Sequence, residues 1–336
     1  MTDWSVKGSV RLLLELSMEC ESLSRAEALS AARALGARPK VVAEDRGVLV
    51  IDASGDAREL ADRLGLCHYV SEWLASGDRA DLERMAEEAE VPGPIRVRST
   101  KVGDTDVDLA SATRRVGAII GKSRGVDLMS PRSDLRIVFS KDVHLGRVIS
   151  AIDRSAFERR KNRYMPFVYP ASLHPKFARA LVNLACVKDS CKLLDPFCGT
   201  GAIVAEAAEI RLEAIGTDIS AKMIAGARTN LRHLGLSAEL RRCDVGDITS
   251  TVGEVAGIAT DPPYGKSTST DGEGIPDLYR RALRSFSEVL RKSSRVAIVV
   301  PDLRLVRAVP GFTLAETHSL WVHRSLTRHF CVLERD

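Results

Sequence analysis

The stretch KLLDPFCGTGAIVAEAAEI, residues 192–210, joins a short apolar segment to a glycine-rich turn and a helical segment. The letters KLLD predict a buried strand that ends at Asp195, and the turn passes through Gly199 and Gly201 into the helix. Further strands are predicted, with helical segments between them, at residues 213–218, 238–244, 255–261 and 295–301. This alternation predicts an α/β fold in which a parallel sheet carries helices on both faces.

Ligands of such a sheet bind beyond the carboxyl ends of its strands. Four predicted strands end there in an acid, namely Asp195, Asp218, Asp244 and Asp261. The glycine turn lacks the Lys-Ser/Thr pair of a phosphate loop and the third glycine of the dinucleotide fingerprint. An acid at its start disfavours phosphate, and Asp218 can accept hydrogen bonds from two ribose hydroxyls. These residues favour a cationic nucleoside such as S-adenosylmethionine, with a purely structural glycine turn as the alternative.

The fourth strand is followed by DPPYG, residues 261–265. The amine of a nucleobase is a poor nucleophile because its lone pair is delocalised into the ring. The Asp261 carboxylate and the Pro262 carbonyl can accept from such an amine and stabilise the positive charge that develops on nitrogen. Pro262 and Pro263 would orient both acceptors, and Tyr264 would stack on a flipped-out base. The alternative is a proline-stiffened turn with an exposed tyrosine.

The N-terminal half predicts two smaller α+β units. Residues 5–75 follow a β-α-β-β-α-β order typical of a ferredoxin-like module. Its first helix is expected to begin with a capping box of Ser24 and Glu27 and to end at Gly36. The expected domains are a ferredoxin-like unit at 1–76, a second unit at 77–153, a linker at 154–170 and the nucleoside-binding domain at 171–336.

Charge, cysteine content and apolar runs bear on whether the protein binds nucleic acid, holds a metal or enters a membrane. The net charge is +4, and the cluster RRKNR at 159–163 moderately favours nucleic-acid binding. Among seven cysteines there is no C-x-x-C pair, so we expect no zinc site and no other metal, while pairing of Cys186 with Cys191 stays open. The polar first ten residues and the lack of a long apolar run predict a cytoplasmic protein without a membrane span.

The motifs DPFCGTG and DPPY resemble those of Rossmann-type methyltransferases that modify exocyclic amines. Residues 98–140 resemble the THUMP domain, an RNA-binding module of tRNA-modifying enzymes. YPASLHPKFARALVNLA (169–185) and HRSLTRHFCVLE (323–334) resemble the archaeal THUMP-domain tRNA guanosine N2-methyltransferases that act at tRNA position 10. This resemblance implies transfer of methyl groups from S-adenosylmethionine to the 2-amino group of a tRNA guanosine. The product would be N2-methylguanosine, or N2,N2-dimethylguanosine after a second transfer.

The resemblance also implies roles for individual residues. The methionine end of the cofactor would be wrapped by Asp195, Phe197, Gly199, Thr200 and Gly201. The ribose, the adenine and the border of the pocket would be contacted by Asp218, Ile219, Asp244, Val245, Leu173 and Pro175. The catalytic residues would be Asp261, Pro262, Pro263 and Tyr264. The residues expected to contact RNA are Lys101, Arg132, Arg324 and Arg328. For His174, at the start of a helix, a capping or surface role is favoured over that of a general base.

Two other functions remain open. One is amino-methylation of a different tRNA or rRNA guanosine, or of adenine. The other is an RNA-binding protein with an inactive methyltransferase fold, against which the intact Asp195, Asp218 and Asp261 argue. The expected partners are tRNA and, as in some members of this group, a small zinc-binding activator protein; a monomer is expected. The sequence leaves the target nucleotide, the number of methyl groups and the need for an activator undecided.

Overall fold

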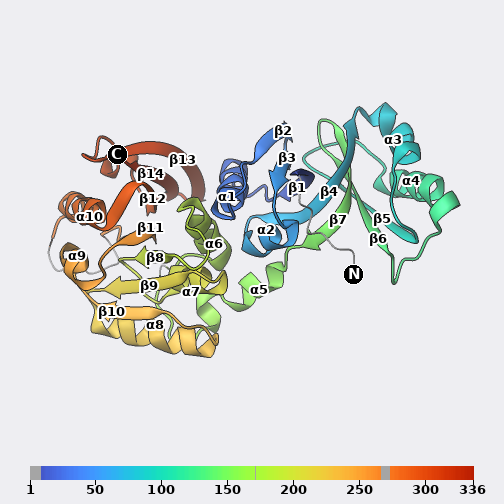
Figure 1. The fold of residues 1–336 in the computed structure, drawn as a ribbon. Coiled ribbons are helices and arrows are strands. Elements are labelled where there is room, and N and C mark those ends of the chain that lie inside the picture. Colours follow the sequence, from blue (N-terminus) through green and yellow to red (C-terminus); the bar gives the residue numbers. More distant parts are fainter. Residues whose placement is uncertain (1–8, 171, 266–272) are drawn as a thin grey trace. The chain divides into compact units, whose positions relative to one another are not determined.

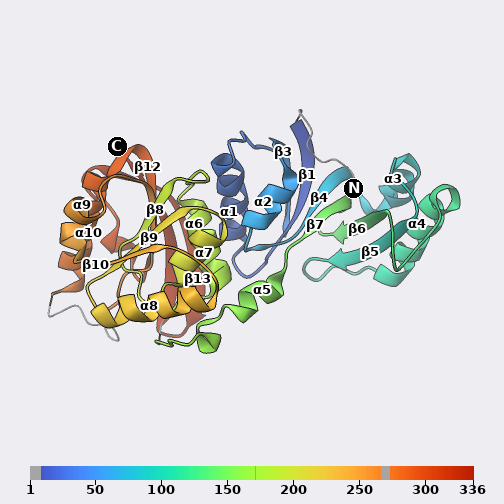
Figure 2. The same ribbon diagram turned by 60° about the horizontal axis from the view of Figure 1, so that its bottom comes forward.

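The computed structural model describes residues 9–170, 172–265 and 273–336 (Figures 1 and 2). They form two compact units. The first contains the described residues up to Glu21, Ala37–Asp62 and Cys67–Ile152. The second contains Ser22–Gly36, Arg63–Leu66 and Asp153–Asp336. Within the described residues each unit is built on a seven-stranded sheet, and no helix there is long and apolar enough to cross a membrane.

The first sheet has the strand order β2-β3-β1-β4-β7-β6-β5. Its strands are β1 (Ser9–Leu16), β2 (Lys40–Asp45), β3 (Val48–Ser54), β4 (Cys67–Gly77), β5 (Ile95–Lys101), β6 (Ser133–Phe139) and β7 (Val143–Ala151). The helices along this part of the chain are α2 (Ala57–Arg63), η1 (Arg79–Asp81), α3 (Leu82–Glu88) and α4 (Leu109–Arg124). β2 with β3 and β6 with β7 form antiparallel hairpins. Because β4 pairs with β7, the strands of both predicted N-terminal units share one sheet; the functional boundary at 76/77 stays a prediction.

Apolar spacing and a cap explain α4. Asp108 accepts a hydrogen bond from the Ser111 N–H and so satisfies a free donor of the first turn. Ala112, Val116 and Ile120, four residues apart, are buried and join the core formed with β5, β6 and β7. This side of the helix therefore faces the sheet, as the sequence pattern predicts.

The second sheet has the strand order β10-β9-β8-β11-β12-β14-β13. Its strands are β8 (Lys192–Asp195), β9 (Glu213–Asp218), β10 (Glu239–Arg242), β11 (Val255–Thr260), β12 (Leu290–Val300), β13 (Phe312–His323) and β14 (Leu326–Arg335). The first five pair in parallel, whereas β14 is antiparallel to β12 and β13 is antiparallel to β14. The predicted α/β fold with a parallel sheet is confirmed, and an antiparallel hairpin of β13 and β14 completes the sheet.

Helices cover both faces of this sheet. They are α1 (Glu21–Ala34), α5 (Arg154–Arg159), η2 (Asn162–Tyr164), α6 (Pro175–Leu184), α7 (Ala202–Glu209), α8 (Ala221–His233), η3 (Val245–Asp247), α9 (Ile248–Thr251), α10 (Ile275–Val289) and η4 (Leu303–Leu305). Phe330 of β14 contacts Phe177 of α6, whereas the next residue, Cys331, belongs to the core under α10. Since successive strand residues face opposite sides, α6 and α10 lie on opposite faces. In both views α8 runs along β10 (Figures 1 and 2).

The predicted capping box of α1 is wrong, whereas its end at Gly36, with φ +85°, is confirmed. The helix begins at Glu21, so Ser24 and Glu27 lie inside it, and both are buried. Glu27, 0% exposed, accepts from the Gly65 N–H at 2.8 Å, the Leu66 N–H at 2.8 Å and the Asn183 amide at 3.0 Å. Burial raises the pKa of Glu27 to about 7. Glu27 therefore joins three distant segments of the second unit and does not cap its own helix.

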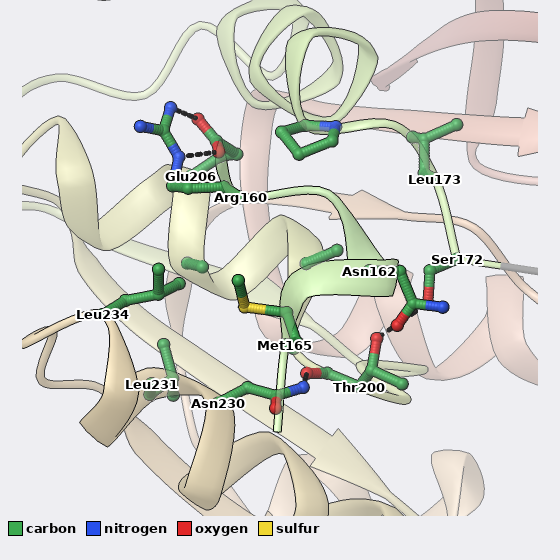
Figure 3. Close-up of a pocket in the computed structure, with 14 residues that line it drawn as sticks. Arg160, Asn162, Met165, Ser172, Leu173, Thr200, Glu206, Asn230, Leu231 and Leu234 are labelled. Atoms are coloured by element: carbon green, nitrogen blue, oxygen red, sulfur yellow. Dashed lines mark hydrogen bonds and ion pairs between the residues drawn. The ribbon is translucent and has the colours of Figure 1, made fainter. Parts of the chain in front are cut away.

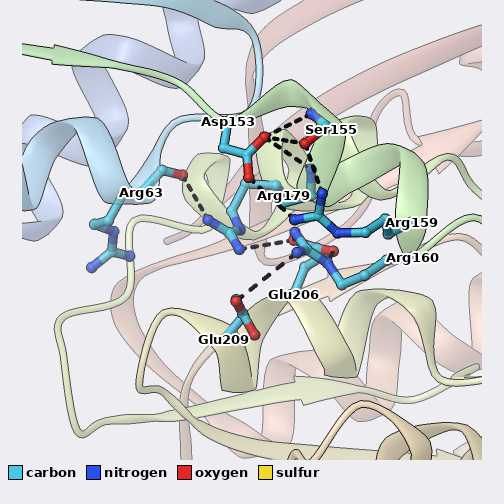
Figure 4. Close-up of polar contacts among 9 residues, drawn as sticks. Arg63, Asp153, Ser155, Arg159, Arg160, Arg179, Glu206 and Glu209 are labelled. Carbon is cyan, nitrogen blue, oxygen red and sulfur yellow. Dashed lines mark hydrogen bonds and ion pairs between the residues drawn. The ribbon is translucent and has the colours of Figure 1, made fainter.

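A second group of polar contacts in this unit involves several arginines, among them Arg160 and Arg179 on either side of Glu206 (Figure 4). Arg63, which is buried, donates to the Val187 carbonyl at 3.0 Å and to Asp189 at 2.6 Å. Glu206 of α7, also buried, pairs with Arg160 at 2.7 Å and with Arg179 at 2.9 Å. Buried charges remain stable only when they are paired and hydrogen-bonded. These pairs attach α6 and α7 to the segment that precedes α6.

Replacement of Glu27 by alanine should destabilise the protein strongly. The change leaves the Gly65 and Leu66 N–H groups buried without their acceptor and removes one of the two acceptors of the Asn183 amide, which keeps the Arg63 carbonyl. The free energy of unfolding should fall by about 2–5 kcal/mol, measured by denaturant unfolding. Glu59→Ala, on the exposed side of α2, is the control and should change it by less than about 0.5 kcal/mol. Equal stability of the two variants would contradict this role of Glu27.

Candidate active site

The carboxyl ends of β8, β9 and β11 bring three predicted acids to one edge of the second sheet. Asp195 ends β8 and Asp218 ends β9, while Asp261 follows Thr260, the last residue of β11. The charges of Asp218 and Asp261 both raise the pKa of Asp195, as expected for carboxylates that lie close together. This edge is where an open α/β sheet binds its ligand.

The glycine turn is held in place by β9. Gly199 adopts φ +49° and donates its N–H to Asp218 Oδ2 at 3.0 Å. The Cys198 N–H donates to the Thr217 carbonyl at 2.9 Å. Gly201, with φ +86°, precedes the first residue of α7, and a Cβ there would lie 3.2 Å from Ala227 Cβ. The loop therefore requires glycine for its backbone conformation and for its close approach to α8.

Asp195 is 1% exposed. It connects the glycine turn to the turn formed by DPPYG, residues 261–265, which we call the elbow. It accepts from the Thr260 hydroxyl at 2.7 Å and from the Phe197 N–H at 3.2 Å. Burial raises the pKa of Asp195 to about 7, and these two hydrogen bonds oppose that rise. The sequence analysis missed Thr260, although a hydroxyl residue at the end of an apolar strand, directly before DPPYG, is a usable signal.

Two backbone N–H groups use part of the hydrogen-bonding capacity of the Asp218 carboxylate. Its Oδ1 accepts from the Ser220 N–H at 2.8 Å and its Oδ2 from the Gly199 N–H. Burial raises its pKa above the ordinary value. An ionised carboxylate offers about four lone-pair positions, so acceptor capacity remains for two further donors. Ser220 caps α8 and accepts from the Met223 N–H, while the neighbouring Ile219 is exposed.

Asp244 lies after β10 and caps the short helix η3. Its Oδ1 accepts from the Gly246 N–H at 2.7 Å and from Arg281 of α10. Arg281 also pairs with Glu273 at 2.7 Å. The neighbouring Val245 is buried. The sequence analysis missed Arg281 because its place opposite Asp244 depends on how α10 packs. No hydrogen bond of Oδ2 is found within the described residues.

The elbow places a tyrosine hydroxyl on the predicted catalytic acid. Tyr264 Oη donates to Asp261 Oδ1 at 2.5 Å, and Asp261 Oδ2 has no hydrogen-bond partner in the part of the chain that the structure describes. Burial raises the pKa of Asp261 to about 6, whereas the Arg328 charge and the Tyr264 hydrogen bond act in the opposite direction. Pro262 is buried, and Gly265 turns the chain away with φ +98°. The geometry leaves one carboxylate oxygen available to accept from an amine.

Leu173 and Pro175 border a small cavity beside the glycine turn (Figure 3). Thr200 and Gly201 also line it, and the Ser172 and Thr200 hydroxyls lie 2.8 Å apart. Its volume of about 20 Å³ holds roughly one water molecule and no nucleoside. The expected capping role of the adjacent His174 is confirmed, because its Nδ1 accepts from the Lys176 N–H at 3.3 Å.

The residues expected to contact RNA lie in both units. Lys101, at the end of β5, and Arg132 are exposed residues of the first unit. Arg324 is exposed in the turn between β13 and β14. Only Arg328 of these four acts on the elbow, where its charge lowers the pKa of Asp261. Within the described residues no group of three His, Cys, Asp or Glu side chains could hold a metal ion.

Comparisons with known proteins identify relatives of this chain. A family model described as RMKL-like, methyltransferase domain, matches residues 162–329. The tRNA (guanine(10)-N2)-dimethyltransferase of Methanothermobacter thermautotrophicus is 36% identical over 97% of this chain and 100% of its own length. The enzyme with the same name from Pyrococcus abyssi is 33% identical over 87% of this chain and 91% of its own.

Related proteins act elsewhere in tRNA or share the fold. The tRNA (guanine(6)-N2)-methyltransferase of Thermus thermophilus is 30% identical over 72% of each chain. The crystal structure of TrmN from Thermus thermophilus superimposes with a TM-score of 0.56 at 25% identity, over 97% of this chain and 100% of the other. The chain therefore belongs to the family of S-adenosylmethionine-dependent guanine N2-methyltransferases that act on RNA and carry an RMKL-like methyltransferase domain.

Proposed function

We propose that this protein methylates the 2-amino group of guanosine 10 in tRNA, to N2-methyl- and then N2,N2-dimethylguanosine. The observation that carries the proposal is the elbow, where the Tyr264 hydroxyl fixes one oxygen of Asp261 and the other oxygen has no hydrogen-bond partner among the described residues. Position 10 is supported by the full-length similarity to an enzyme named for it. Guanosine 6 is the second candidate, supported by the similarity to the Thermus thermophilus enzyme.

The cofactor's place is proposed from the groups that remain free at the strand ends. Asp218 has acceptor positions for two ribose hydroxyls, with Ile219 beside it, and Asp244 Oδ2 can accept from the adenine amine next to Val245. A Cβ at Gly199 would meet only the Phe197 carbonyl, at 3.9 Å, so there is space beside the loop for the methionine part. Residues 195–201 would line that part, with Leu173 and Pro175 at the border. S-adenosylmethionine supplies a methyl group on a sulfonium, which an amine attacks in line.

The elbow residues would prepare the amine for this attack. Asp261 Oδ2 and the Pro262 carbonyl accept its two N–H groups and draw nitrogen toward tetrahedral geometry. Positive charge on nitrogen grows as the methyl group arrives, and two preorganised acceptors stabilise it in that state more than in the ground state. Asp261 can then take the proton that the methylated amine releases. Tyr264 would hold the base by stacking while its hydroxyl orients Asp261.

We further propose that the N-terminal half, with the THUMP-like unit at 77–153, supplies affinity for tRNA. The chain would act as a monomer in the cytoplasm, where a small zinc-binding activator could assist it. The deciding experiment is nucleoside mapping of tRNA after incubation with the purified chain and S-adenosylmethionine. Methylated guanosine should appear at position 10, and a tRNA with adenosine at position 10 should stay unmodified. Modification at position 6 instead would establish the second candidate, and activity only with an added activator would settle that partner.

Asp218→Ala should weaken cofactor binding about ten- to a hundredfold. The variant loses the ribose acceptors and also the hydrogen bonds from the Gly199 and Ser220 N–H groups, and a hydrogen bond to a charged group contributes roughly 1.5–3 kcal/mol. Calorimetric titration with S-adenosylmethionine measures the effect. Asp277→Ala, an exposed acid of α10, is the control. An Asp218→Ala protein that binds as tightly as this control would exclude the ribose role.

Asp261→Ala should slow methyl transfer roughly a hundred- to a thousandfold, because one preorganised acceptor is lost from the transition state. Single-turnover rates at saturating cofactor and tRNA isolate this step, and binding of both should change little.

In the parent protein the rate of methyl transfer should fall as pH falls through about 6, since protonation of Asp261 removes the acceptor. In the parent protein the hydrogen bond from Tyr264 lowers the pKa of Asp261. Its loss in Tyr264→Phe should therefore raise this pKa and move the midpoint to higher pH. A midpoint that stays in place would contradict the orienting role of Tyr264.

The double variant Lys101→Ala, Arg132→Ala should weaken tRNA binding and leave cofactor binding unchanged. Each lost phosphate contact reduces the slope of log affinity against log salt by about 1, so the slope should decrease by about 2. Filter binding of tRNA over a salt series measures it. Arg58→Ala, an exposed arginine of α2, is the comparison. A slope equal to that of the parent would remove both residues from the RNA surface.

A further inference from the structure

The cationic side chain of Arg328 lies beside the elbow because β14 runs antiparallel to its neighbours. β14 pairs with β12 so that His329 lies opposite Val300, the last residue of β12. Arg328, one residue earlier, therefore lies at the edge where the parallel strands end and where Asp261 follows β11. It is close enough that its charge lowers the pKa of both Asp261 and Tyr264.

Two hydrogen-bond donors near Asp261 lack acceptors. Arg328 Nε is buried, and Arg328 makes no hydrogen bond or ion pair within the described residues. Tyr279 Oη of α10 belongs to a side chain that is 1% exposed and likewise has no partner there, although it interacts electrostatically with Asp261. A buried donor without an acceptor costs about 1–3 kcal/mol unless a ligand or water satisfies it. Both groups thus point to a ligand that offers acceptors at the elbow.

The elbow itself presents mainly acceptors. Asp261 and Pro262 can bind an exocyclic amine, but acceptors alone do not distinguish guanine from another purine with the same amine. Guanine adds O6 and N7, two acceptors that an arginine reads with a pair of parallel N–H groups. The free Nε of Arg328 and a terminal nitrogen form such a pair.

We propose that Arg328 binds the O6 and N7 acceptors of the flipped guanine and makes the site selective for guanine among purines that carry a 2-amino group. The proposal rests on the proposed function, because it assumes that a tRNA guanosine enters the elbow. It assigns Arg328 a specificity-determining role within the site, distinct from a general contact with the RNA backbone.

The test compares tRNA that carries guanosine with tRNA that carries 2-aminopurine riboside at the methylated position found by nucleoside mapping. 2-Aminopurine keeps the 2-amino group and lacks O6. The parent protein should methylate guanosine with a kcat/KM roughly tenfold higher, because 2-aminopurine keeps N7 and so loses half of a bidentate base contact. Arg328→Ala should lose most of this preference by slowing the guanosine reaction while the 2-aminopurine reaction changes little. Arg328→Lys, which keeps the charge but not the paired N–H groups, should lose most of it too.

Arg324→Ala is the matched control, because it removes the same charge from the exposed turn of the same hairpin. It should affect both substrates equally and keep the preference for guanosine. Cofactor titration of the Arg328 variants verifies that they are folded. Equal slowing of both substrates in Arg328→Ala, or a parent protein without preference, would overturn the proposal. A parent protein that methylates no tRNA guanosine would instead disprove the proposed function, so the two failures are distinguishable.

Discussion

The arrangement of the site depends on three carboxylates at one edge of the second sheet, of which Asp195 is buried and Asp218 and Asp261 are half-buried. Burial raises the pKa of Asp195, Asp218 and Asp261, and mutual repulsion adds to the rise for Asp195. Hydrogen bonds from Thr260, from the backbone of the glycine turn and from Tyr264 offset part of this cost. A sulfonium and a nucleobase amine that becomes positive are the partners that such a cluster would stabilise. Cationic groups that bind here would relieve the repulsion between the carboxylates. The electrostatics of the unliganded site therefore favour methyl transfer from a sulfonium to an amine.

The hydrogen bond between Thr260 and Asp195 connects the two halves of this chemistry. Asp195 starts the turn that would hold the cofactor, and Thr260 precedes the elbow that would hold the base. Because β8 and β11 are neighbours in the sheet, a displacement of one strand end would also shift the other. Methyl transfer requires the donor carbon and the acceptor nitrogen to be aligned within a fraction of an ångström. A buried bond between the two strand ends is one means of keeping that alignment.

The second unit is assembled from separated parts of the chain. Residues 22–36 and 63–66 belong to it, and Glu27 and Arg63 join them to Asn183 and the segment after α6. A fragment that begins at residue 171 would lack these segments and would leave Asn183 without its acceptor Glu27. Two segments of the N-terminal half therefore complete the core of the second unit, which carries the candidate active site.

The sequence by itself determined the α/β class, the parallel strands of the second sheet and the acids at the strand ends. These features follow from local patterns, namely apolar runs, turn residues and acids at fixed places after a strand. It did not reveal Thr260 on Asp195, Arg281 on Asp244, the place of Arg328 beside Asp261, or the Tyr279 hydroxyl, which has no partner in the described part of the chain. It also led to the wrong role for Glu27, since a Ser-x-x-Glu pattern fits a helix start as well as a helix interior. Only the tertiary structure decided these points, because each depends on which strands and helices become neighbours, and that is set by packing between residues far apart in the chain.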